Sequence, residues 1–228
     1  MDSDMHSDTD SGMDWSAWHE GYDDPGSWQA RRLRAVQELV REALDGAPAG
    51  ELRIVSLCAG QGRDVLGVLA DHPRRADVRA RLVELDPRNT ATARRLAEAA
   101  GLGARVEVVT GDAALPARYA GLVPADLVLV CGVFGNLTDA DVARTVRACR
   151  ALCRTGGTVI WTRHREAPDL VPRILDWFAG AEFEQLRLSP PDAGYGVGAH
   201  RFTGTPDEPA PEQRMFDFVG YPHLRPGR

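Results

Sequence analysis

Lysine is absent from this sequence, so every permanently basic side chain is an arginine. Schiff-base catalysis is therefore excluded, because it needs a lysine amine as the nucleophile. A phosphate-binding P-loop is excluded as well, because its motif contains a lysine that contacts the phosphates. Two classes of lysine-dependent chemistry are thus ruled out before any motif is considered.

Positive charge and cysteine are both scarce. The formal net charge is −6 at pH 7, and the sequence has four cysteines. Nucleic-acid-binding proteins usually carry a basic surplus that neutralises phosphates, so we expect no nucleic-acid partner. No Cys-x-x-Cys pair occurs, and disulfides rarely form in a reducing compartment. We therefore expect free thiols and predict no metal site.

Long apolar runs are missing too. No stretch reaches the roughly 18 apolar residues of a membrane-spanning helix. The N-terminus opens with Asp2, Asp4, Asp8 and Asp10 in place of the apolar run of a signal peptide. We expect a cytoplasmic protein without a membrane partner, and the sequence leaves its oligomeric state open.

The sequence has 228 residues, of which 43% are hydrophobic. This length and hydrophobic content suit one α/β domain with an N-terminal extension. Residues 1–14 are acidic, small and polar, which predicts disorder. Residues 15–50 hold an aromatic arm, which ends at Tyr22, and a helix that Ser27 is placed to cap. The arm either packs on the domain or forms a lid over a ligand site. The domain itself is predicted to span residues 51–228.

Short apolar strands alternate with helices in the first part of this domain. The predicted strands are 52–57, 80–85, 105–110, 126–131 and 158–163. Such alternation indicates a parallel sheet that is covered on both faces. The segments 182–188, 196–202 and 214–219 are also strand-like but have no helices between them. They predict an antiparallel addition at one edge of the sheet.

Three helix boundaries can be predicted inside the domain. A helix is expected from Asn89 to Ala100. Thr138 is placed to cap the next helix, with Asp141 as its capping-box partner. The glycines at 156–157 are expected to end that helix before the fifth strand.

Ligands of an open α/β sheet bind beyond the carboxyl ends of its strands. The first strand is followed by Cys58-Ala59-Gly60-Gln61-Gly62-Arg63-Asp64. Its two glycines permit a tight turn and a close approach of ligand to backbone. Acids follow the second strand, where they suit the paired hydroxyls of a ribose. Spacing from the glycines favours Asp86 for this role, with Glu84 as the alternative.

The third and fourth strands end in segments that complete such a site. After the third strand comes Gly111-Asp112-Ala113, where the carboxylate of Asp112 is placed to accept from an adenine amino group. After the fourth strand comes an apolar, flexible stretch, residues 131–136. Four features in the correct order and spacing point together to an adenosine-containing ligand.

This succession resembles the class I SAM-dependent methyltransferases over roughly residues 52–188. "VSLCAGQGRD" resembles their glycine-rich first motif, "LVELDP" the acidic second, "TGDAA" the third and "ADLVLVCGVF" the fourth. The resemblance implies a Rossmann-like, doubly wound, seven-stranded sheet that is mostly parallel, with antiparallel strand(s) at one edge. It also implies S-adenosyl-L-methionine (SAM) as cofactor and S-adenosylhomocysteine as product.

The resemblance assigns parts of SAM to particular residues. Gly60 and Gly62 would approach the methionine part, Asp86 would hold the ribose, and Asp112 the adenine. Cys58 stands where the family usually has an acid, and Asp64 stands where it has a third glycine, so Asp64 is predicted to contact the SAM amino group instead. The segment Tyr22-Asp23 resembles one with which many family members cover the cofactor. The full predicted cofactor set is Tyr22, Cys58, Ala59, Gly60, Gly62, Asp64, Asp86, Pro87, Asp112, Ala113, Cys131, Gly132 and Val133.

The predicted reaction is direct displacement, in which the protein mainly holds donor and acceptor in near-attack geometry. His164 follows the fifth strand, on the substrate side of the sheet, and is the first candidate for a general base. His19 in the aromatic arm is the second. The alternative is that both histidines lie on the surface without a catalytic role.

We therefore predict SAM-dependent methyl transfer to an oxygen, nitrogen or carbon atom of a small-molecule acceptor, such as a secondary metabolite. The fourth motif lacks the Asn/Asp-Pro-Pro-aromatic signature of enzymes that methylate nucleobases or amides, which agrees with the acidic charge. One alternative is a module that binds SAM without catalysis. Another is an NAD-dependent oxidoreductase, but its third glycine would stand at Val65, and its Tyr-x-x-x-Lys pair needs a lysine.

Overall fold

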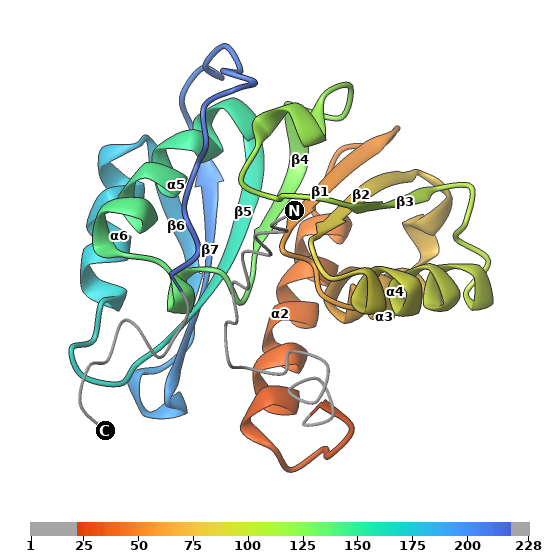
Figure 1. Ribbon diagram of the computed structural model, residues 1–228, viewed down its shortest axis with the longest axis horizontal. Helices are drawn as coiled ribbons and strands as arrows, with labels where there is room; N and C mark the ends of the chain where they lie inside the picture. Colours follow the sequence, from red (N-terminus) through yellow and green to blue (C-terminus); the bar gives the residue numbers. More distant parts are fainter. Residues whose placement is uncertain (1–21, 220–228) are drawn as a thin grey trace, which may run out of the picture.

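The computed structural model describes residues 22–219, which form a seven-stranded sheet in the order β3-β2-β1-β4-β5-β7-β6 (Figure 1). The strands are β1 (Leu52–Leu57), β2 (Val78–Glu84), β3 (Val106–Thr110), β4 (Ala125–Val130), β5 (Cys153–His164), β6 (Phe183–Leu188) and β7 (Tyr195–Phe202). Strands β1 to β5 pair in parallel, and β7 runs antiparallel to both β5 and β6. The predicted Rossmann-like, doubly wound sheet is confirmed.

Helices cover both faces of the sheet (Figure 1). One face carries α2 (Trp28–Asp45), α3 (Arg63–Leu69) and α4 (Pro87–Ala99), and the other carries α5 (Asp139–Leu152) and α6 (Val171–Gly180). Short 3-10 helices lie in the connections between the strands and helices of the described residues: η2 (Pro73–Ala76), η3 (Pro116–Tyr119), η4 (Phe134–Asn136) and η5 (Pro191–Ala193). Between residues 22 and 219, none of the helices has the length and apolarity needed to cross a membrane.

Each face of the sheet has its own apolar core because successive side chains of a strand point to opposite faces. Ile54 of β1 packs with Val40 of α2 on one face, and its neighbour Val55 belongs to the core of the other. That second core includes Trp161 of β5, whose ring stacks on Phe178 of α6 at 6.1 Å between centroids. Each such side chain contributes about 1.5–3 kcal/mol when fully buried. The two cores hold the strand ends, and hence the loops beyond them, in fixed positions.

Two predicted helix caps are confirmed. The Ser27 hydroxyl accepts from the Ala30 N–H at 3.0 Å at the start of α2. The Thr138 hydroxyl accepts from the Asp141 N–H at 3.2 Å at the start of α5. The predicted capping box does not close, because the Asp141 carboxylate pairs with Arg144 at 2.5 Å.

The glycines at 156–157 do not end a helix, contrary to the prediction. Helix α5 ends at Leu152, and β5 begins at once with Cys153, so the glycines lie inside the strand. The pairing of β4 with β5 shifts register there, between Ala125 and Leu127. A Cβ on Gly157 would meet the Cys153 Sγ at 2.8 Å, so the glycine is needed for this irregular start of the strand.

The predicted strand at 214–219 is wrong. After β7 the chain turns back as an irregular segment, residues 203–219, which runs along α5 from the amino edge of the sheet to its carboxyl edge (Figure 1). The Met215 N–H donates to the Ala114 carbonyl at 2.9 Å, and Met215 and Phe216 are buried in the core of that face. Only η3 connects β3 to β4, where a doubly wound sheet usually has a full helix. The 203–219 segment fills the space beside α5 that such a helix would cover.

Candidate functional site

The turn after β1 has a left-handed backbone at three of its five residues. We call residues 58–62 the glycine turn. The φ angles of Cys58, Gly60 and Gly62 are +49°, +55° and +69°. A Cβ on Gly62 would meet Leu82 Cδ1 at 2.7 Å, so no larger residue fits there. Glycine adopts this backbone without strain, whereas Cys58 does not, and strained non-glycine residues are often found at ligand sites.

The two acids that follow β2 have different positions. Glu84 is the last residue of the strand, and its carboxylate accepts from the N–H groups of Gly60 and Asp86, each at 2.9 Å. Asp86 caps α4, where its carboxylate accepts from the Arg88 N–H at 2.8 Å and pairs with the Arg88 guanidinium at 2.7 Å. The hydrogen bond from Arg88 lowers the pKa of Asp86. The structure thus places Glu84, and not Asp86, against the glycine turn, and Pro87 serves as the first residue of α4.

Asp64 is a buried acid in the first turn of α3. Its Oδ1 accepts from the Val65 N–H at 2.8 Å, and burial raises its pKa to about 6. Burial also raises the pKa of Tyr22 and of the Cys131 thiol, and the nearby charge of Asp64 raises both further. These three residues, predicted from separate motifs, are therefore brought together at the ends of β1 and β4.

Cys58 cannot take over the charge of the acid that its position usually holds. Burial, followed by the charges of Glu84 and Asp112, raises the pKa of its thiol, so it stays neutral at physiological pH. Ala59 next to it donates its N–H to the Val83 carbonyl at 3.0 Å, which fixes the turn against β2. Asp64 is consequently the acid of the first motif.

Tyr22 and Asp23 contact Arg63, the first residue of α3. The Tyr22 hydroxyl accepts from Arg32 Nη2 at 3.1 Å, and the Arg63 guanidinium lies 5.7 Å from the centre of the Tyr22 ring. Asp23 pairs with Arg63 at 2.7 Å. The rest of the predicted arm, including the candidate base His19, lies outside the described residues.

The third motif is fixed by local bonds and by one distant partner. Asp112 Oδ1 accepts from the Ala114 N–H at 2.9 Å, and the Ala113 carbonyl accepts from the Tyr119 hydroxyl at 2.8 Å. The other oxygen of Asp112 pairs with Arg214 of the 203–219 segment. Sequence reasoning missed Arg214, because nothing in the local pattern links residues 102 positions apart.

The loop after β4 leaves open space at Gly132. Gly132 has a φ of +75°, and a Cβ built on it would meet no atom within 4 Å. Its N–H donates to the Thr162 hydroxyl at 2.8 Å, and its carbonyl accepts from Asn136 Nδ2 at 3.0 Å. Val133 beside it is buried. Thr162 and Asn136, which fix this loop, were not among the predicted residues.

His164 is the last residue of β5 and is half-buried. A Cβ on Gly135 would lie 3.7 Å from its Cδ2 atom, so the imidazole sits beside the loop that follows β4. The structure therefore places the first candidate base at the carboxyl edge of the sheet, next to the loop that follows β4.

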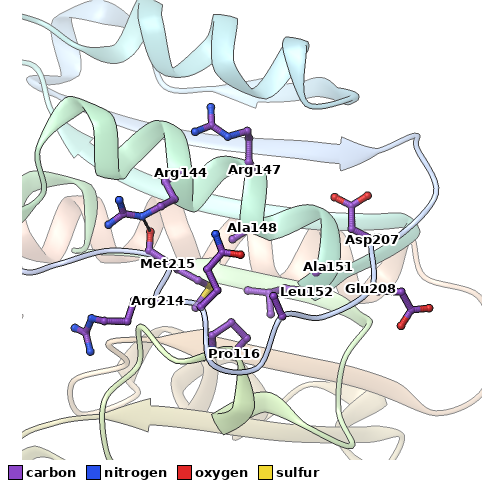
Figure 2. A pocket seen from close by; sticks show the side chains of 12 residues that line it. Pro116, Arg144, Arg147, Ala148, Ala151, Leu152, Asp207, Glu208, Arg214 and Met215 are labelled. Carbon is purple, nitrogen blue, oxygen red and sulfur yellow. Dashed lines mark hydrogen bonds between the residues drawn. The ribbon is translucent and has the colours of Figure 1, made fainter.

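A cavity of about 280 Å³ lies elsewhere, between α5, η3 and the 203–219 segment (Figure 2). Arg144 and Arg147 of α5 line one side, and Asp207 and Glu208 lie at its other end. None of the predicted cofactor residues lines it. Arg214, which pairs with Asp112, is among its lining residues, so the cavity lies next to the loop that follows β3.

Comparison with known proteins agrees with this geometry. Residues 19–175 match the sequence profile of a family described as "Putative methyltransferase". The uncharacterized protein YnbC of Escherichia coli (strain K12) is 28% identical over 149 residues, which cover 63% of this chain and 25% of YnbC. The chain thus spans about a quarter of the length of that relative.

Solved structures share the fold. An O-methyltransferase family protein from Burkholderia thailandensis has a TM-score of 0.64 at 17% identity, over 85% of this chain and 61% of its own. The 1,6-didemethyltoxoflavin N1-methyltransferase of the same organism, solved with its substrate and S-adenosylhomocysteine, has a TM-score of 0.59 at 19% identity, over 83% and 85%. The chain therefore belongs to this family of putative methyltransferases, and it has the fold of these methyltransferase structures.

Proposed function

We propose that this protein transfers the methyl group of SAM to an oxygen, nitrogen or carbon atom of a small-molecule acceptor. One observation carries the proposal: Asp64, Glu84 and Asp112 lie at or just after the carboxyl ends of the neighbouring parallel strands β1, β2 and β3, and the charges of Glu84 and Asp112 both act on Cys58 between them. SAM has an ammonium group, a ribose diol and an adenine amino group, and each of these donates hydrogen bonds that a carboxylate accepts. The residues present therefore fit the cofactor.

The assignment of residues follows from their positions. Asp64 would bind the ammonium group, because a neighbouring cation favours the ionised form of a buried acid. Glu84 would accept from the ribose hydroxyls, since each carboxylate has about four acceptor sites and the two backbone bonds leave some of them available. This assignment replaces Asp86, which stabilises α4 instead. Asp112 would accept from the adenine amino group.

The remaining predicted residues shape the site. Gly60, Gly62 and Gly132 permit close approach of the backbone, and Tyr22 is positioned to cover the glycine turn. The other members would line the cofactor through backbone or apolar contact: Cys58, Ala59, Ala113, Cys131 and Val133.

His164 is the group that we assign to proton transfer. When bound, SAM would supply a methyl group on a sulfonium, to which an electron pair of the acceptor forms a bond as the carbon–sulfur bond breaks and S-adenosylhomocysteine leaves. The imidazole would accept a proton from an acceptor that arrives protonated, and the rigid loops of β4 and β5 would hold that acceptor close to it. Tyr22 would help to exclude water from the proposed cofactor site, whereas α2 packs on the sheet of the SAM-binding domain, which we assign to residues 51–228.

Two observations support a small acceptor. The net charge of −6 disfavours binding to the phosphate backbone of a nucleic acid. The 1,6-didemethyltoxoflavin N1-methyltransferase, which shares the fold, was solved with the small molecule 1,6-didemethyltoxoflavin bound. We place the protein in the cytoplasm without a nucleic-acid or membrane partner. The second candidate, a module that binds SAM without catalysis, keeps the same cofactor site and differs only in lacking transfer.

Calorimetric titration of the full chain with S-adenosylhomocysteine, SAM and NAD tests the proposal. We expect the first two to bind with micromolar dissociation constants and NAD to give no heat. Mass spectrometry with a panel of phenols, amines and heterocycles then looks for a gain of one methyl group. Heat from NAD alone would contradict the cofactor assignment, and SAM binding without transfer to any acceptor would favour the binding module.

A further inference from the structure

The 203–219 segment reaches the carboxyl edge of the sheet between two loops of the proposed cofactor site. It contacts the loop after β3 through the bond from the Met215 N–H to the Ala114 carbonyl. It contacts the loop after β4 through a bond of 3.0 Å from the Val219 N–H to the Asn136 carbonyl. Since Asn136 also donates to Gly132, both ends of residues 215–219 are bonded to loops that we assign to the SAM site.

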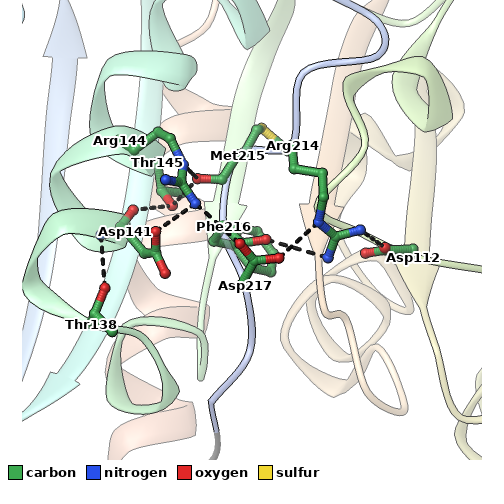
Figure 3. Close-up of polar contacts among 9 residues, drawn as sticks. All are labelled: Asp112, Thr138, Asp141, Arg144, Thr145, Arg214, Met215, Phe216 and Asp217. Atoms are coloured by element: carbon green, nitrogen blue, oxygen red, sulfur yellow. Dashed lines mark hydrogen bonds and ion pairs between the residues drawn. The ribbon is translucent and has the colours of Figure 1, made fainter.

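The side chain of Arg214 lies between two acids (Figure 3). Its guanidinium pairs with Asp112 on one side and with Asp217, at 2.9 Å, on the other. Arg144 of α5 extends this chain, because it contacts Asp141, Asp217 and, at 3.0 Å, the Met215 carbonyl (Figure 3). The direction of Arg214 is therefore set by its own segment and by α5.

These pairs are too exposed to serve mainly as stabilising interactions. The side chains of Arg214 and Asp112 are 45% and 34% exposed, and exposed ion pairs contribute little to folding. Arg214 does, however, place a fixed fork of donors beside the acceptor oxygens of Asp112. An edge of adenine has the matching pattern, an amino group that donates next to a ring nitrogen that accepts.

We propose that Arg214 is a specificity-determining residue of the cofactor site, where it recognises the adenine edge together with Asp112. The inference rests on the proposed function, because it takes SAM as the ligand of the loop after β3. It adds the 203–219 segment to the site as the wall between the loops of β3 and β4. Arg214 of this segment would thus help to select adenine as the base of the cofactor.

The test compares two ligands, S-adenosylhomocysteine and S-inosylhomocysteine, whose base has a 6-oxo group in place of the amino group. Wild-type protein should prefer the adenine ligand, because the oxo group can only accept and would face the Asp112 carboxylate. Arg214→Gln should weaken S-adenosylhomocysteine binding by about tenfold and reduce this preference, since hydrogen bonds to charged groups are the stronger ones. Isothermal titration calorimetry measures both constants.

Arg150→Gln is the matched control. Arg150 also pairs with two acids, Asp207 of the same segment and Glu182, but its α5 position lies away from the cofactor loops. We expect this variant to keep both affinities within about twofold, because surface pairs alter stability only slightly. An equal loss of affinity in both variants would mean that the segment acts only as a structural tie, and would overturn the proposal.

If Arg214→Gln does not fold, Asp217→Asn tests the proposal instead. This variant keeps Arg214 and removes only its ion pair with Asp217. A reduced preference for the adenine ligand supports the proposal, and an unchanged preference overturns it. If wild-type protein binds S-adenosylhomocysteine and Arg214→Gln keeps the same affinity and preference, the inference fails while the proposed function stands. If wild-type protein does not bind S-adenosylhomocysteine, the proposed function itself fails.

Discussion

The carboxylate of Glu84 accepts a hydrogen bond from the backbone N–H of Gly60, with 2.9 Å between oxygen and nitrogen. This bond joins the end of β2 to the turn after β1, so the acid and the glycine turn form one rigid unit. Asp86, two residues later, turns away into the cap of α4. The proposed ribose acceptor, Glu84, and the helix cap, Asp86, are thus separate residues that stand close together in the sequence.

Replacing each acid by its amide separates the two roles. Glu84→Gln should weaken S-adenosylhomocysteine binding by about 1–3 kcal/mol, because the ribose hydroxyls lose a charged acceptor. Asp86→Asn should leave the affinity unchanged and reduce the free energy of unfolding by less than about 1 kcal/mol, since asparagine also caps helices. Calorimetry and urea denaturation measure the two effects. The opposite pattern of affinities would restore Asp86 as the ribose acceptor.

Asp64→Asn should weaken ligand binding and raise the free energy of unfolding of the ligand-free protein. Above pH 6 the wild-type carboxylate is ionised and binds the ammonium group, so the variant should bind S-adenosylhomocysteine about 10 to 100 times more weakly at pH 7.5. Affinity of the wild-type protein should fall as the pH drops below 6, because protonation removes the charge. Asp71→Asn, which removes an exposed acid, should leave affinity unchanged at both pH values.

The stability of the ligand-free protein gives an independent check on Asp64. Its pKa in the folded state, about 6, lies above the value of 3.8 for an unperturbed carboxyl. The folded chain therefore holds the proton more tightly, and this contribution to stability is full below pH 3.8 and lost as the pH rises through 6. Relative to wild type, Asp64→Asn should gain up to about 3 kcal/mol between pH 4 and pH 8. If the free energy of unfolding changes equally with pH in the two proteins, the burial of the Asp64 charge is contradicted.

His164→Gln should lower the rate of methyl transfer by about 10²- to 10⁴-fold, the usual contribution of a general base. The affinity for S-adenosylhomocysteine should stay the same, because the imidazole lies beside the acceptor side of the loop after β4. Single-turnover kinetics with an acceptor from the mass-spectrometric panel measure the rate. A rate equal to that of wild type would remove His164 from the mechanism and indicate an acceptor that arrives without a proton to lose.

Acid should destabilise the protein through His200. This histidine stacks on Phe178 at 4.3 Å in the core, and within residues 22–219 neither ring nitrogen has a hydrogen-bond partner. Burial lowers its pKa from 6.5 to about 4, so the unfolded chain takes up the proton first. Stability from this residue is therefore present above pH 6.5 and lost as the pH falls through 4.

His200→Phe tests that relationship, since it keeps an aromatic ring in the stack and cannot be protonated. Between pH 7.5 and pH 4.5 the variant should lose up to about 3 kcal/mol less stability than the wild-type protein. Urea denaturation at the two pH values provides the comparison. An equal loss in both proteins would show that other groups control the acid response.

The sequence was sufficient for the sheet and for helix starts that depend on one local bond. Alternation of apolar runs with helical periods predicts β1 to β5, and a hydroxyl before an apolar helix predicts the caps at Ser27 and Thr138. The segment 214–219 was misread because its apolar residues look like those of a strand. Met215 and Phe216 instead bury their side chains beside α5, where only η3 connects β3 to β4. No local sequence pattern records that a full helix is missing at that position.

For the site, the sequence identified the loops better than the residues within them. It placed the acids after β2 at the ligand edge but could not tell which one ends the strand and which one caps the helix, since both Glu84 and Asp86 fit an acidic strand tip. Arg214 could not be found at all, because its contact with Asp112 exists only after the chain folds back along α5. The roles of Asp64 and His164 stay predictions.

The return of the 203–219 segment to the ligand edge has a consequence for the order of folding. The contact between Asp112 and Arg214 closes a loop of 102 residues, whereas the contact between Gly60 and Glu84 closes one of 24. The longer loop costs about 1.3 kcal/mol more chain entropy if it forms first, so the shorter contacts come earlier. During synthesis on the ribosome, the loops of the glycine turn and β2 can assemble while the chain is still growing. The base-recognising side of the site follows only once residue 214 has been made and released.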